Sequence, residues 1–119
     1  MLRDFNISNF KKMKPPSDNT FDTSQEIKAL KKIPLNKKFV KDYDNIEKAF
    51  AKTAEEQSID YDKKIAAKLI TASAPIILKL KKHFDRPRPK ALAKKMNIKI
   101  KDIEMDSMKT ASYPSGHTA

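Results

Sequence analysis

YDKKIAAKLITASAPIILKLKKHF, residues 61–84, is the stretch that decides the fold class. Its apolar side chains recur mostly at every fourth position, which is the spacing of one face of an α-helix. That face consists of Ile65, Leu69, Ala72, Ile76, Leu80 and Phe84. The pattern predicts a long helix over about 61–84, and Pro75 is expected to kink this helix or divide it into two pieces.

The preceding segment continues the helical pattern. Apolar residues at spacings of 4, 3, 4 and 4 predict a helix over about 36–57, and these residues are Phe39, Tyr43, Ile46, Phe50 and Ala54. Thr23 and Glu26 have the spacing of a capping box and predict a short helix over about 23–32. Pro34 then stops that helix, because proline cannot continue the backbone hydrogen bonding.

The remaining segments complete an all-α expectation. Residues 1–22 are predicted to form an extended or loose arm, and residues 98–113 a long connection without firm periodicity. Pro89 suits the first position of a short helix over about 90–96. We therefore expect one helical domain over 23–119, preceded by the arm.

Composition limits the possible functions. A chain of 119 residues fits one domain, and its net charge of +11 favours anionic partners such as nucleic acid, anionic lipid or phosphorylated small molecules. The absence of cysteine excludes disulfide scaffolds, Cys-ligated zinc and thiol catalysis. The single glycine, Gly116, excludes Gly-rich phosphate loops. No apolar run fits a signal peptide or a membrane span, so we expect a soluble chain of undetermined compartment.

KKHFDRPRP, residues 81–89, is the first candidate site. Lys81 falls on the last turn of the predicted helix and Arg88 just beyond it, so both cations can converge on one anion. The planar fork of Arg suits phosphate oxygens, and Lys adds a compact point charge. The alternative is an ordinary basic helix end, where cations favour the negative pole of the helix dipole.

PSGH, residues 114–117, is the second candidate site. Pro114 can begin a helix, and the backbone N–H groups of Ser115 and Gly116 would then form an anion site at its N-terminus. His117 would lie one turn in, where a histidine can act as a general acid near neutral pH. The alternative is a turn that carries a surface histidine.

Taken together, K-x6-RP at 81–89 and SYPSGHT at 112–118 resemble the first two signature motifs of the type 2 phosphatidic acid phosphatase superfamily. The likeness is greater to its soluble branch, the class A bacterial non-specific acid phosphatases. Their first motif also has an aromatic residue and an extra Arg, which Phe84 and Arg86 match. Vanadium-dependent haloperoxidases share the motif set, with vanadate in the phosphate site. The resemblance implies a helical bundle of the acid phosphatase and haloperoxidase type, of which this chain would be the N-terminal half.

The resemblance also implies a role for each matching residue. Lys81 and Arg88 would bind phosphate oxygens and stabilise the transferring phosphoryl group. Ser115 and the Gly116 amide would bind further oxygens, and His117 would protonate the leaving alkoxide. The substrate would be a phosphorylated small molecule, no metal would be required, and phosphate or vanadate could occupy the site. Complete soluble relatives are often periplasmic.

The third motif of the family, Ser-Arg-x5-His-x3-Asp, holds the histidine nucleophile and is not found in these 119 residues. His83 does not replace that nucleophile by pattern, so we expect a fragment with little or no turnover. Lys79-x6-Arg86-Pro87 also fits the first motif, which makes Lys79 and Arg86 accessory candidates. The pairing of Lys81 with Arg88 is preferred, because the aromatic residue and the extra Arg then match the soluble branch.

Other functions and partners remain open in the sequence. Residues 79–101 hold ten basic residues and one acidic residue, which fits a helical module that binds nucleic acid or anionic surfaces non-specifically. Aromatic residues for base stacking are sparse there. Lipid phosphatase activity is disfavoured, because membrane members of the superfamily have several membrane spans and none is expected in this chain. We also expect a homo-oligomer that buries the apolar faces of residues 39–54 and 65–84.

Overall fold

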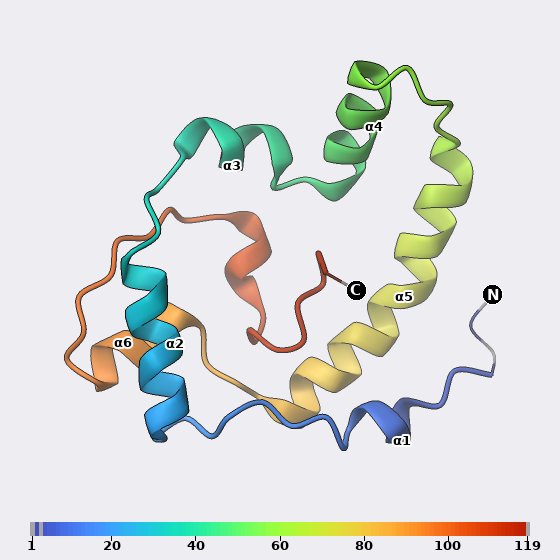
Figure 1. The fold of residues 1–119 in the computed structure, drawn as a ribbon. Coiled ribbons are helices and arrows are strands. Elements are labelled where there is room, and N and C mark those ends of the chain that lie inside the picture. The colour runs from blue at the N-terminus through green and yellow to red at the C-terminus, as the bar shows by residue number, and fades with distance from the viewer. Residues whose placement is uncertain (1, 3, 119) are drawn as a thin grey trace.

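The protein is all-α in the computed structural model, with 56% of the chain in helices and no strand among the described residues. The structure describes residues 2 and 4–118, so residues 1, 3 and 119 of the expected arm and domain lie outside the described part. The helices are α1 (Ile7–Phe10), α2 (Phe21–Lys31), α3 (Lys37–Tyr43), α4 (Ile46–Glu56), α5 (Lys63–Phe84), α6 (Pro89–Lys95) and the 3₁₀-helix η1 (Asp106–Lys109) (Figure 1).

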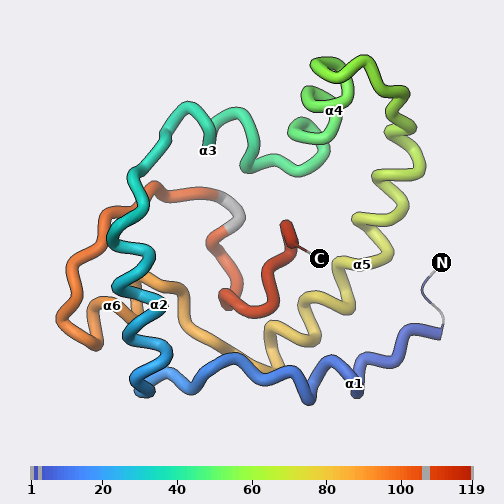
Figure 2. Tube along the Cα trace, viewed as in Figure 1, coloured from blue at the N-terminus to red at the C-terminus, as the bar shows by residue number. Residues whose placement is uncertain are grey.

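The helices form an open arc around the C-terminal segment. Neighbouring helices pack in the pairs α3 with α4, α4 with α5, α1 with α5, and α2 with α6. Residues 110–118 run inside this arc (Figure 2). The molecule is flat, with extents of 46 × 37 × 20 Å. The fold therefore brings the segment with the second motif against the end of α5, which carries the first.

The packed core is small and lies where α2 meets α6. Ile27, Leu92 and Ala93 form it, and Ile98 and Ile100 pack against it from the segment after α6. Several residues on the apolar faces of α3, α4 and α5 are exposed, although Leu80 near the end of α5 is buried. Phe39, Phe50, Ile65 and Leu69 are 58%, 57%, 54% and 47% exposed. These residues belong to the two faces for which an oligomer is expected.

Local capping explains where the helices begin. The expected helix over 36–57 is wrong as a single element: it is two helices, because the Asn45 side chain accepts a hydrogen bond from the Lys48 N–H and caps a new start. The expected N-cap at Thr23 is also wrong. Thr20 caps α2 and accepts from the Thr23 N–H, while Thr23 itself is fully buried in the first turn.

The long helix α5 matches the expected one closely and begins after its N-cap, Asp62. It continues through Pro75 and is not divided into two pieces. Proline removes only one backbone donor, so the hydrogen bonds of the other turns can carry the helix past it. Nearby, the Ser73 hydroxyl donates to the carbonyl of Ile70 at 3.1 Å.

The described residues of the arm expected over 1–22 include the short helix α1, which packs against α5. The Tyr113 hydroxyl donates to the Met13 carbonyl at 2.8 Å. The Thr23 hydroxyl donates to the Ser17 carbonyl at 2.7 Å. The arm is thereby tied both to α2 and to the segment with the second motif.

Candidate functional site

The candidate site begins at the C-terminal end of α5, where the chain turns sharply. Asp85 adopts the left-handed conformation (φ 46°, ψ 40°), and its N–H donates to the Lys81 carbonyl at 2.8 Å, which ends the helix. Arg88 follows in an extended conformation (φ −64°, ψ 153°), as expected for a residue before proline. Pro89 then begins α6. The first motif is therefore a corner between two helices.

The second motif is held on this corner by backbone and aromatic contacts. The Ser112 N–H donates to the Arg86 carbonyl at 2.9 Å, and the Ser112 hydroxyl lies 3.0 Å from the Pro87 carbonyl. The rings of Phe84 and Tyr113 meet edge to face, with centroids 5.0 Å apart. The two candidate sites, separated in sequence, therefore meet in space.

Lys81 and Arg88 converge on the same stretch of backbone. The Lys81 ammonium donates to the Ala111 carbonyl at 2.5 Å, and the Arg88 Nε–H donates to the Thr110 carbonyl at 2.8 Å. The Lys81 residue is only 6% exposed. Burial lowers the pKa of Lys81 below its ordinary value, and the nearby positive charge of Arg88 lowers that pKa further. Two cations thus lie close together in a partly dehydrated corner.

The PSGH segment forms a turn within the described residues. The helix expected to begin at Pro114 is absent from the described residues, where 116–118 form a turn. The Ser115 hydroxyl accepts from the Thr118 N–H at 3.3 Å, the hydrogen bond of an N-cap, but no helical backbone hydrogen bond follows it within the described segment. The described residues end at Thr118, so a helix N-terminus at Gly116 stays a prediction.

His117 is turned toward the junction of α3 and α4. Its Nε2 donates to the backbone carbonyl of Asp44 at 2.6 Å and lies 3.9 Å from the Asp44 carboxylate. Asp44 and Arg88 line the same groove, which has a volume of about 1320 Å³. His117 is thus anchored at a wall of the groove that Arg88 also borders, rather than hydrogen-bonded to the cation pair itself.

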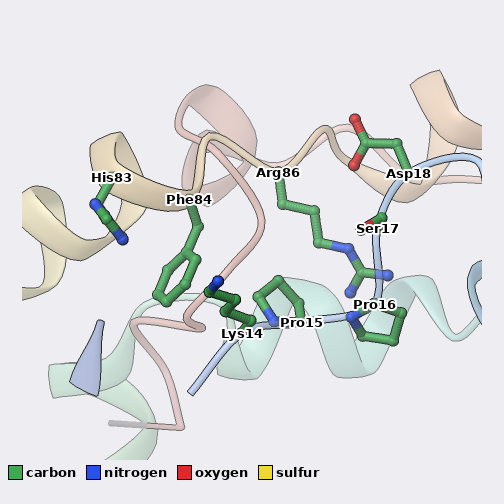
Figure 3. Close-up of a pocket in the computed structure, with 8 residues that line it drawn as sticks. All are labelled: Lys14, Pro15, Pro16, Ser17, Asp18, His83, Phe84 and Arg86. Atoms are coloured by element: carbon green, nitrogen blue, oxygen red, sulfur yellow. The ribbon is translucent and has the colours of Figure 1, made fainter. Parts of the chain in front are cut away.

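Arg86, an accessory candidate, ties the first motif to α2. Its guanidinium donates to the Glu26 carboxylate at 2.6 Å and to the Thr23 hydroxyl at 3.3 Å, and its buried Nε makes no hydrogen bond to any described residue. Arg86 also borders a pocket of about 440 Å³ between the arm and the end of α5, which Figure 3 shows. Lys79, its partner in the alternative motif register, is exposed on α5.

The groove is the feature that the sequence interpretation missed. Residues 98–109, which fall in the long connection expected over 98–113, supply much of its lining. A weak signal was present, since Ile98 and Ile100 have the alternating spacing of an extended segment with one apolar side.

Neither a metal-binding cluster nor a membrane-spanning helix is found among the described residues. They contain no cluster of three or more His, Cys, Asp or Glu side chains that could hold a metal ion. None of the described helices is long and apolar enough to cross a membrane. Comparison with protein-family models, with curated proteins and with solved structures gives no match.

Proposed function

We propose that this chain binds phosphate monoesters between Lys81, Arg88 and the segment 110–118, as the anion-binding part of an acid-phosphatase-like hydrolase. One observation carries the proposal: the buried Lys81 and the nearby Arg88 donate to the carbonyls of two adjacent residues, Ala111 and Thr110, directly before the second motif. The charge of Arg88 also lowers the pKa of Lys81.

The energetics of the Lys81 ammonium support an anion at this corner. Removing a cation from water is costly, and a neutral carbonyl such as that of Ala111 offsets the cost only in part. The positive charge of Arg88 adds to the cost. A phosphate dianion between the two side chains would turn repulsion into attraction and would accept charge-assisted hydrogen bonds from both.

The proposed chemistry follows the resemblance to the acid phosphatases. Attack on phosphorus by a histidine nitrogen would form an N–P bond and break the ester P–O bond. His117 would give its proton to the departing alkoxide, while Lys81 and Arg88 would stabilise the charge on the other phosphate oxygens. The attacking histidine belongs to the third motif, which these 119 residues do not contain. We therefore propose binding without turnover for this chain.

Titration with inorganic phosphate, followed by isothermal calorimetry and ³¹P NMR, tests the proposal. Arg88→Met should weaken binding about tenfold or more, because a hydrogen bond to a charged group contributes about 1.5–3 kcal/mol. Lys101→Met removes the same charge from an exposed position outside the groove and should leave binding nearly unchanged. Hydrolysis of p-nitrophenyl phosphate should stay at background.

The comparison of Arg88→Met with Lys101→Met also tests the alternative function, a non-specific basic module. Equal weakening by both variants would show that phosphate responds only to net charge, which would overturn the site and favour the non-specific basic module. Absence of any phosphate binding would overturn the proposal outright.

A further inference from the structure

The groove beside α3, α4 and α6 has an aliphatic floor. Val40, Ile98, Ile100, Met105 and Met108 contribute to it, and all are half-buried. Ile98 and Ile100 also pack against the core, so the floor is the outward side of the packed interior. The two methionines have unbranched, adaptable side chains, which suit a surface that fits a partner.

The rim of the groove is basic. Its lining includes seven Lys or Arg residues against three Asp or Glu residues. Lys41 and Lys48 stand on the α3 and α4 side, and Lys94 and Lys99 are contributed by α6 and the segment after it. All four are exposed. An apolar floor between two lines of lysines is the complement of an amphipathic segment with acidic flanks.

Among anionic partners, the lining favours a peptide over a nucleic acid. None of the lining residues is aromatic, so bases would find no stacking surface, and a phosphate backbone would leave the aliphatic floor uncovered. A second copy of this chain fits poorly, because its net charge is +11. An acidic amphipathic helix satisfies both parts of the groove at once.

We propose that this groove binds an acidic amphipathic helix of a partner protein. The aliphatic stripe of that helix lies on the floor near Met105 and Met108, and its carboxylates face the lysines of the rim. Arg88 lines this groove as well as the proposed phosphate site, so the argument rests on Lys41, Lys48, Lys94 and Lys99, which the proposed phosphate site does not use.

Fluorescence anisotropy with a labelled model peptide tests this proposal on the full chain. The probe is a helical peptide of about 18 residues, with Leu at the i, i+3, i+4 and i+7 positions and Glu on the remaining face. A scrambled peptide of equal composition and a peptide with Lys in place of Glu are the ligand controls. A single-stranded oligonucleotide of matching charge is the competitor.

Two protein variants address the floor and the rim separately. Met105→Ser/Met108→Ser should weaken the peptide about tenfold, and Lys94→Glu/Lys99→Glu should weaken it about as much and reduce its salt dependence. Lys28→Glu/Lys31→Glu on α2 changes the same charge outside the groove and should alter binding by less than about threefold. Circular dichroism checks that each variant keeps its helix content.

Selective binding of the Leu and Glu peptide, lost in both groove variants and kept in the α2 variant, supports the proposal. No binding of this peptide overturns it, as does binding that the scrambled peptide matches. Weakening by the rim variant alone, with the oligonucleotide competing equally, shows an electrostatic surface and overturns it as well.

Discussion

Lys81→Met is the substitution that separates the proposed phosphate site from the stability of the fold. Methionine keeps most of the buried apolar stem of Lys81 and removes only its charge and its hydrogen bond to the Ala111 carbonyl. The exposed Lys79, two residues earlier on α5, is the matched control. It is also the lysine of the alternative motif register, so the pair decides between the two registers.

The expected magnitudes differ for stability and for binding. Loss of the ammonium–carbonyl hydrogen bond costs about 1.5–3 kcal/mol. Relief of the buried charge and of its repulsion with Arg88, the two causes that lower the pKa of Lys81, acts in the opposite direction, and replacing a buried charge by an apolar group of similar volume is often nearly neutral. The free energy of unfolding should therefore change by less than about 1 kcal/mol. For phosphate binding, the hydrogen bond lost in Lys81→Met is not offset in this way, so the Kd for phosphate should rise roughly ten- to hundredfold.

Urea unfolding followed by circular dichroism measures the first quantity, and calorimetric titration with phosphate measures the second. Lys79→Met should change the Kd by about twofold or less, because an exposed charge is screened by solvent. Equal binding by the Lys81 variant and the unsubstituted chain would refute the reasoning. A larger loss in the Lys79 variant would assign the motif to the other register.

Three further outcomes are expected. Because the pKa of Lys81 is lowered in the folded state, the unfolded chain binds more protons between that lowered pKa and 10.5, so the free energy of unfolding rises with pH in this window. The difference in unfolding free energy between the unsubstituted chain and Lys81→Met, measured at increasing alkaline pH, should show this rise. A difference that stays constant with pH would contradict it. Glu26→Gln should lower the unfolding free energy by about 1–3 kcal/mol, because the mostly buried Arg86 loses its carboxylate partner. In the same urea titration, the control Glu55→Gln at an exposed site should change the unfolding free energy by less than about 0.5 kcal/mol. Sedimentation velocity should show self-association that Phe50→Ser/Leu69→Ser abolishes, and a strictly monomeric unsubstituted chain would contradict the oligomer.

The elements predicted well are those with an uninterrupted helical period. The spacing of apolar residues over 61–84 is long enough to outweigh one proline, and α5 ends within that range as expected. The meeting of the two motifs was predicted from the resemblance and from the placement of Lys81 and Arg88 around a helix end. Both cations contact residues 110 and 111, which lie directly before the second motif, and their role in binding phosphate stays a prediction.

The elements predicted poorly depend on single hydrogen bonds. The spacing of apolar residues over 36–57 does not show that Asn45 can cap a second helix, so one helix was expected where the chain has two. The capping-box spacing pointed to Thr23 as the N-cap, but Thr20, three residues earlier, caps the helix with its hydroxyl. The groove could not be predicted, because its two sides come from α3, α4 and the segment after α6, which are joined only by tertiary packing.

The alternation of arginine and proline at 86–89 explains how one short motif serves both the fold and the proposed site. Each proline restricts the arginine before it to extended backbone, so the two guanidinium groups have little freedom to exchange roles. Arg86 donates hydrogen bonds to Glu26 and Thr23, which holds the corner between α5 and α6 against α2. Arg88 contacts residue 110 beside Lys81. Because this geometry exists without a bound anion, the entropy cost of arranging the cations would be met during folding, and the binding energy of the proposed phosphate would be left for its recognition.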